Sequence, residues 1–206
     1  MAQARVPASV GAALALTLVL SVATPARAAD SATYTLDPAA SAVDFTIYAS
    51  KIFKFKREGQ FTDFTGQLSF DPVNPLGTQV DLTVFTSSVD IHNDEHNQLL
   101  KSGAFFDVEH FPTMQFTSSS TDAKPDGTFS MTGDLTIRGI TQRMTIPMKL
   151  TLAAETGRPS RALLESTFEI DRTAFGLTAA ANAHGFSVSL SKSVRIHLAM
   201  ATHPKN

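Results

Sequence analysis

The chain has 206 residues and carries 17 lysines and arginines against 19 acidic residues, a formal net charge of −2. This balance excludes the broadly basic surface that non-specific nucleic-acid binding requires, so we expect no nucleic-acid partner. The chain has no cysteine, which excludes disulfides and a lipid-modified amino-terminal cysteine. The fold must therefore be held together by its core.

The first 28 residues predict a cleavable export signal. Arg5 gives a weakly positive start, residues 10–23 are apolar but short for a membrane span, and Ala26-Arg27-Ala28 supplies the small residues of a cleavage site. An uncleaved membrane anchor is the alternative. We expect residues 1–28 to be a signal peptide, and residues 29–206 to form one domain in the periplasm or outside the cell. Removing Arg5 and Arg27 would leave 15 basic residues against 19 acidic ones, a net charge of −4.

Most of residues 29–206 alternate between apolar and polar side chains, which predicts strands with one apolar face. Turn sequences rich in proline and glycine separate these runs, so the pattern indicates an antiparallel sandwich or barrel. Pro147 lies inside an apolar run and predicts an edge, a bulge or a bend in that strand. The clearest alternations span residues 43–48, 53–56, 80–85, 144–152 and 186–198.

Residues 93–116 break this pattern and predict a short helix that begins near Asp94, with Asn93 or Asp94 as its cap. The segment is rich in large apolar side chains, so we expect it to form a plug or lid against the β-structure. These side chains are Leu99, Leu100, Phe105, Phe106, Phe111 and Phe116.

A series of short motifs, taken together and in order, resembles the YceI-like family of secreted lipid-binding proteins. The resemblance spans essentially all of residues 29–206. Its strongest elements are Tyr34-Thr35-Leu36-Asp37, Gly59-x-Phe61-Thr62-Asp63-Phe64-x-Gly66, Leu100-Lys101-Ser102-x-x-Phe105-Phe106-Asp107, Gly133-Asp134-Leu135-Thr136-Ile137 and Asp171-Arg172-x-x-Phe175-Gly176-Leu177.

The resemblance implies an all-β fold, a lipocalin-like antiparallel β-barrel of about eight strands with a short helix packed against it. It also implies a long apolar cavity for a polyisoprenoid chain. True lipocalins match less well, because their early Gly-x-Trp cannot occur in a chain without tryptophan. Many family members carry Arg, Asp and His in the loop before the helix, where this chain has His96, Asn97 and Leu99, so the identity of the ligand stays open.

The interior is expected to be rich in phenylalanine, since the chain has 15 Phe but only 2 Tyr. Such a composition suits either a lined cavity or a solid core. Strand parity gives the face of a residue but does not distinguish these two. The predicted ligand-binding residues are Phe45, Ile47, Phe53, Phe55, Phe105, Phe106, Met148 and Phe186.

Two polar clusters have alternative interpretations. His92 and His96, with Asp94, Glu95 and His110 nearby, have the residue types of a metal site, but solvated loop histidines are the favoured interpretation and no metal is expected. The basic run Lys51, Lys54, Lys56 and Arg57 would either receive a lipid headgroup or an anionic membrane, or protect a strand edge.

No catalytic motif is present: there is no G-x-S-x-G, no phosphate-binding loop and no cysteine. We therefore expect no enzyme and no cofactor other than a bound isoprenoid lipid or quinone. The predicted function is binding of an isoprenoid quinone or polyprenyl phosphate for transport, storage or protection. The alternatives are a ligand-free structural, interaction or stress-response barrel, an auxiliary that delivers quinone to a membrane redox partner, and an enzyme acting on the bound lipid. Transient contact with a membrane or membrane protein fits these functions, and the oligomeric state is open, with a dimer among the alternatives.

Overall fold

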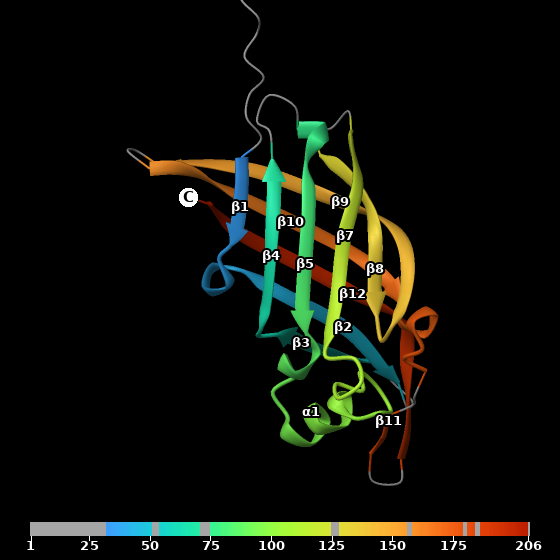
Figure 1. Cartoon of the computed structure of the whole chain (residues 1–206). Helices are drawn as coiled ribbons and strands as arrows, with labels where there is room; N and C mark the ends of the chain where they lie inside the picture. The colour runs from blue at the N-terminus through green and yellow to red at the C-terminus, as the bar shows by residue number, and fades with distance from the viewer. Residues whose placement is uncertain are drawn as a thin grey trace, which may run out of the picture.

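The computed structural model describes residues 32–50, 54–70, 75–124, 128–155, 158–178, 181–183 and 186–205. The predicted signal peptide lies outside these residues. Within them the chain forms one α-helix, α1 (Asp94–Lys101), and is otherwise mostly strand (Figure 1). The strands are β1 (Ala32–Leu36), β2 (Ala42–Ser50), β3 (Lys54–Phe61), β4 (Phe64–Phe70), β5 (Gln79–Phe85), β6 (Val89–Asp90), β7 (Thr113–Ala123), β8 (Phe129–Ile137), β9 (Ile140–Glu155), β10 (Arg158–Asp171), β11 (Ala181–Ala183) and β12 (Phe186–Pro204). Four 3₁₀-helices complete the list: η1 (Pro38–Ala40), η2 (Pro75–Gly77), η3 (Thr86–Ser88) and η4 (Arg172–Phe175).

Eight strands close into an antiparallel barrel, as the sequence predicts. They follow the order β1-β4-β5-β7-β8-β9-β10-β12, and β12 closes the ring by pairing with β1, with Thr35 opposite His203. Closure gives each of these strands a partner on both sides, which removes the unpaired edges that favour aggregation.

Three further strands extend the wall at one end. Strand β2 pairs with β12 from Ala42↔Ala199 to Ser50↔Ser189, and β3 pairs with β2 along its whole length. The short β6 pairs with β3 only at Gln60 and Phe61. Figure 1 shows that this extension lies at the same end of the barrel as α1.

Pro147 illustrates how the sheet accommodates a residue without a backbone donor. In β9, residues 140–148 pair with β8, whereas pairing with β10 begins at Lys149. The proline therefore lies where the strand changes partners, and its carbonyl oxygen accepts a bond from the hydroxyl of Ser166 at 2.5 Å. Pro147 thus has no ladder partner in β10, which agrees with the edge position among the predicted alternatives of an edge, a bulge or a bend.

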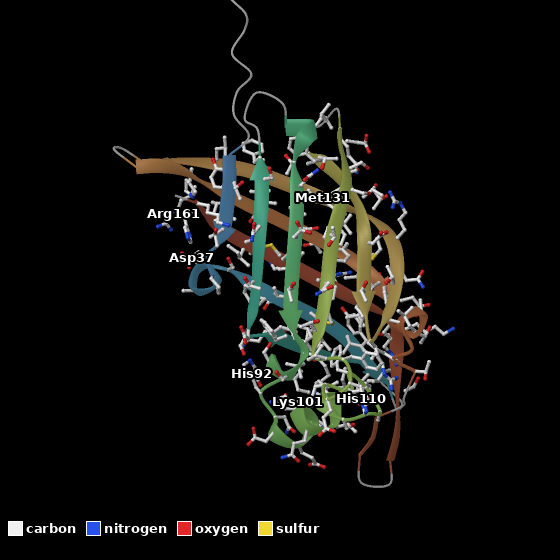
Figure 2. The ribbon with its side chains drawn as sticks, viewed as in Figure 1. Asp37, His92, Lys101, His110, Met131 and Arg161 are labelled. Carbon is white, nitrogen blue, oxygen red and sulfur yellow. The ribbon has the colours of Figure 1, made fainter. Side chains whose placement is uncertain are left out.

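The interior is closely packed at the end of the barrel away from α1, and this end is called the solid half. At the end away from α1, the side chains of Leu68, Met131, Ala162 and Leu164 are at most 2% exposed, and Met131 is labelled in Figure 2. The sheet itself is tight at Gly133, where little room remains for added atoms. A Cβ at Gly133 of β8 would lie 2.5 Å from the carbonyl oxygen of Thr117 and 2.6 Å from the Phe116 ring.

The helix α1 has the predicted start. Asn93 is its N-cap, and the side-chain oxygen accepts a bond from the backbone N–H of His96 at 2.9 Å. Asp94 in the first turn and Lys101 in the last complement the helix dipole. In the part of the chain described, no helix is long and apolar enough to cross a membrane.

Candidate functional site

An apolar cavity of about 260 Å³ extends from the α1 end of the barrel into its interior. It reaches the level of the solid half, because its lining includes Val80, Ile146 and Met200. These residues pair with Leu68, Met131 and Leu164. The cavity wall includes inward-facing residues of β2, β5, β8, β9 and β12, together with residues of α1 and of the segment that follows it. The space beside Leu68 and Leu164, in the solid half, measures about 10 Å³, which suffices for no more than one water. The interior is thus hollow from the α1 end up to the closely packed side chains of the solid half.

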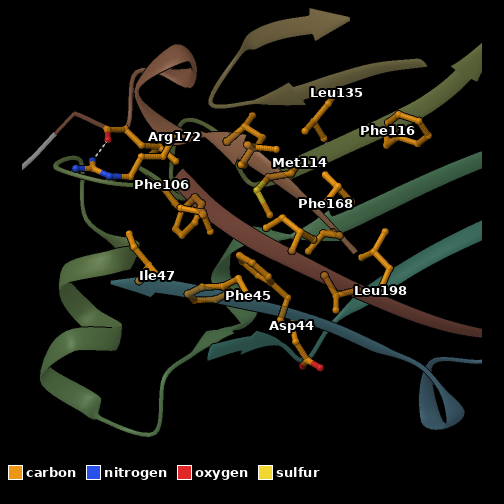
Figure 3. A pocket seen from close by; sticks show the side chains of 18 of the residues that line it. Asp44, Phe45, Ile47, Phe106, Met114, Phe116, Leu135, Phe168, Arg172 and Leu198 are labelled. Carbon is orange, nitrogen blue, oxygen red and sulfur yellow. Dashed lines mark hydrogen bonds between the residues drawn. The ribbon is translucent and has the colours of Figure 1, made fainter. Parts of the chain in front are cut away.

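The wall of the cavity is aromatic on one side. The ring centroids of Phe45 and Phe61 lie 5.6 Å apart, and Phe61 meets Phe106 at 5.6 Å in an edge-to-face arrangement. Figure 3 shows that Phe45, Ile47, Phe106 and Phe168 surround the same space. Aromatic pairs with ring centroids at this separation contribute about 0.5–1.5 kcal/mol each beyond the area they bury, so they stabilise this side of the wall.

The segment after α1 forms the predicted plug. Phe105 is 4% exposed, and both it and Phe106 line the cavity. Backbone bonds fold this segment tightly: the N–H of Phe106 donates to Leu100, and that of Asp107 donates to Ser102. Asp107 has φ of +52°, a conformation in which aspartate is tolerated better than most residues.

Arg138 ties this plug to the opposite loop. It lies in the tight β8–β9 turn with φ of +51°, followed by Gly139 with φ of +72°. Its guanidinium donates to the carbonyl oxygen of Gly103 at 2.8 Å and to that of Gly176 at 3.0 Å. One side chain therefore holds the segment after α1 against the loop that follows β10.

That second loop is a compact turn built on η4. Asp171 accepts bonds from the N–H and the hydroxyl of Thr173, and these bonds hold the pKa of the Asp171 carboxyl below its ordinary 3.8. Gly176 ends η4 with φ of +73°, in the left-handed region that glycine adopts without strain.

Arg172 is a buried cation in the cavity wall. It is 7% exposed, its Nε donates to the carbonyl oxygen of Ser191 at 2.9 Å, and its Nη1 donates to that of Leu177. Figure 3 shows Arg172 at the periphery of the cavity, with its guanidinium directed at the backbone. Burial lowers the pKa of this guanidinium. Its bonds join η4 to β12, so it stabilises the wall.

Five of the eight predicted ligand-binding residues line the cavity: Phe45, Ile47, Phe105, Phe106 and Met148. The structure does not place Phe55 with them, because its side chain is 51% exposed and lies outside the wall. Phe55 pairs with Ala49, which lines the cavity. The sequence therefore predicted the correct face of the sheet for Phe55, but not its position along the barrel axis. Phe53 and the side chain of Phe186 lie outside the described residues.

Sequence reasoning also missed polar residues of the wall. Arg57 and His96 line the cavity. From the sequence, Arg57 was grouped with three lysines and was not among the predicted ligand-binding residues. The alternation of the strand already contains this information. Arg57 is two residues from Phe55 and therefore lies on the same face as Phe55, opposite to that of Lys56. Asp44 is also in contact with the cavity region, but Figure 3 shows its carboxylate pointing away.

The histidines are dispersed. His92 lies before α1 with φ of +58°, and His110 lies after the plug with its Nδ1 2.8 Å from Asp107 Oδ1 (Figure 2). That bond raises the pKa of the His110 imidazole above its ordinary 6.5. Among the described residues, no three His, Asp or Glu side chains are grouped as metal ligands.

Comparison with known proteins identifies the family. The profile of the YceI-like domain matches residues 34–202. The chain belongs to the YceI-like family. YceI-like relatives include a UPF0312 protein of Ectopseudomonas mendocina, 38% identical over 91 residues, which are 44% of this chain and 48% of that protein. A UPF0312 protein of Vibrio vulnificus is 33% identical over 65% of this chain and 70% of its own length. The chain spans about half the length of the first curated relatives it matches.

Solved structures show the same fold. BcnA of Burkholderia cenocepacia superposes with a TM-score of 0.67 at 24% identity, covering 81% of this chain and 98% of BcnA. A polyisoprenoid binding domain from Saccharophagus degradans superposes with a TM-score of 0.62 at 14% identity, covering 84% of this chain and 98% of that domain. At these identities the likeness establishes the fold of this YceI-like chain and not its ligand.

Proposed function

We propose that this protein is an exported carrier that holds one amphiphilic, isoprenoid-like lipid in the cavity of its barrel. The observation that carries the proposal is the uneven filling of the barrel. The solid half is packed to below 3% exposure at its central residues, while an apolar space of about 260 Å³ extends from there to the α1 end. A size near 300 Å³ and apolar, aromatic walls are typical of small-molecule sites.

The energetics of the space support this function. At about 24 cal/mol per Å³ of cavity, a void of 260 Å³ costs about 6 kcal/mol relative to a filled core. That cost is comparable with the whole stability of an ordinary domain. An apolar ligand that fills the space would recover part of this free energy. An isoprenoid chain provides the required apolar surface at about 25 cal/mol per Å² buried.

Two points support an exported location: the predicted signal peptide, and the resemblance to the YceI-like family, which is described above as secreted. Transport, storage or protection of the lipid, including delivery of a quinone to a membrane partner, would each use the same cavity. We propose no catalytic step and no metal, because the described residues of the wall bring together no nucleophile with a base and only dispersed polar groups.

Native mass spectrometry of protein purified from its own host tests the proposal. The expected result is a one-to-one complex that loses its added mass on organic extraction, with an isoprenoid-like lipid in the extract. After delipidation, the protein should bind farnesol, a fifteen-carbon isoprenoid alcohol, with one site per chain. A protein that carries no lipid and binds no farnesol would instead be a structural or interaction barrel.

A further inference from the structure

We infer that Arg57 at the cavity mouth selects lipids with an anionic head group, phosphate or carboxylate, over neutral ones of the same chain. This inference rests on the proposed function and names the class of ligand that the cavity takes. The starting point is the position of Arg57 in β3. It lies opposite Ile47, which lines the cavity, and paired residues of antiparallel strands share a face. Arg57 therefore points to the interior side of the sheet.

Arg57 also marks the boundary between cavity and solvent. Its side chain lines the cavity and is exposed at the same time. The pairing of β3 on its outer side is limited to Gln60 and Phe61 among the described residues, so Arg57 lies on a stretch without a strand neighbour there. A long side chain in this position lays its apolar stem along the wall and keeps its guanidinium at the water boundary. A lipid that buries its tail in the cavity would present its head group at this boundary.

The charge of Arg57 is available to a ligand. Within the part of the chain that the structure describes, its guanidinium makes no hydrogen bond and no ion pair. The neighbouring carboxylate of Glu58 lies on the other face of β3, where it pairs with Lys56 at 2.5 Å. Arg172, the other guanidinium of the wall, differs because its donors are directed at backbone carbonyls. His96 of α1 adds a second polar side chain to the wall.

These features favour an anion over a neutral head group. A guanidinium binds phosphate or carboxylate through two parallel charge-assisted bonds, whereas a quinone carbonyl or an alcohol offers one neutral acceptor. The chain as a whole carries a net charge of −2, so any attraction for an anion must be local. Because Arg57 is partly hydrated, its contribution lies between that of a surface pair and that of a buried charged bond.

The test compares farnesyl phosphate with farnesol, which share one chain and differ in head-group charge. Delipidated wild-type protein should bind farnesyl phosphate about 5- to 30-fold more tightly, the factor that 1 or 2 kcal/mol represents. Arg57→Gln should abolish this preference by weakening the binding of farnesyl phosphate much more than that of farnesol, while Arg57→Lys should retain part of it. Lys56→Gln is the matched control, because it removes the same charge one residue away on the other face, and it should keep the preference. The preference should also shrink between about 0.1 M and about 1 M salt.

The other outcomes are decisive. Equal affinity for the two ligands in the wild type, or a preference that survives Arg57→Gln, overturns the inference but leaves the proposed function intact. Binding of neither ligand refutes the proposed function itself. Inorganic phosphate alone should not compete; if it displaces farnesyl phosphate at equal concentration, Arg57 is a phosphate site independent of the cavity and the inference fails. Circular dichroism of each variant establishes that folding is unchanged.

Discussion

A matched pair of substitutions can test whether the barrel is hollow at one end and solid at the other. Ala49 of β2 lines the cavity and is 7% exposed, whereas Ala162 of β10 is 0% exposed in the solid half. Replacing each by leucine adds the same three carbons. In the cavity, the added carbons fill empty apolar space, and at about 0.8 kcal/mol per buried CH₂ they stabilise the delipidated protein by up to about 2 kcal/mol.

The same substitution has the opposite sign in the solid half. There is no room for the new atoms beside Ala162, and overpacking costs about 1–3 kcal/mol. Urea unfolding of delipidated protein measures both, because a shift in midpoint at constant m-value reports a change in stability. Delipidation is essential, since a bound lipid adds its own stabilisation to the folded state.

Ligand binding gives a second measurement on the same proteins. Ala49→Leu occupies space that a lipid tail would use, and the loss of about 2 kcal/mol of burial corresponds to about 30-fold weaker binding of farnesol. Ala162→Leu should leave the Kd unchanged as long as the protein is folded. If both substitutions destabilise the protein to the same extent, the half beside Ala49 is filled and the reasoning is wrong. If Ala49→Leu stabilises the protein without weakening binding, the lipid binds elsewhere.

Three further predictions concern the loops and the sheet. Arg138→Gln removes both bonds that tie the plug to the opposite loop and should lower the free energy of unfolding by about 1.5–3 kcal/mol. The control Arg143→Gln removes an ion pair whose side chains are 61% and 53% exposed, and should lower it by less than about 1 kcal/mol. Equal effects of the two variants in urea unfolding would argue against the tie. Gly133→Ala should cost about 1–3 kcal/mol because its Cβ would overlap a neighbouring carbonyl and ring, and a neutral effect on thermal unfolding would contradict that geometry. The bond from Asp107 raises the pKa of His110, so its stabilising effect is complete below the ordinary value of 6.5 and is lost as the pH rises through the higher folded value. Asp107→Asn should return the His110 titration, followed by NMR, toward 6.5; an unchanged midpoint would assign the shift to another group.

The sequence predicted the class of fold and most faces of the strands. Alternation placed Phe45, Ile47 and Met148 on the interior side, and the capping residue Asn93 located the start of α1. Both succeed because side-chain direction in a strand and the pairing of N–H groups at a helix start are local properties. The family motifs then supplied the closure of the sheet, which no local pattern encodes.

Depth along the barrel could not be predicted in the same way. Alternation gives the side of the sheet on which a residue lies, but its distance from the barrel end depends on how far neighbouring strands are shifted. Phe55 faces the interior side yet extends past the cavity, and its side chain is 51% exposed. The same limit hid the division of the core, because Ala49 and Ala162 are both buried alanines in alternating strands and only their axial positions distinguish them.

The division of the barrel also explains how the fold tolerates an empty cavity. The solid half buries Leu68, Met131 and Leu164 almost completely, and the closed ring of eight strands leaves no unpaired edge among them. The stabilisation gained there offsets the cost of about 6 kcal/mol for a void of 260 Å³ at the other end. The hollow end then needs fixed walls rather than a dense core. Its walls are fixed by polar ties at the rim, since Arg138 joins the plug to the loop after η4 and Arg172 joins η4 to β12. A change in these ties should therefore alter the cavity before it alters the barrel, and a change in the solid half should unfold both.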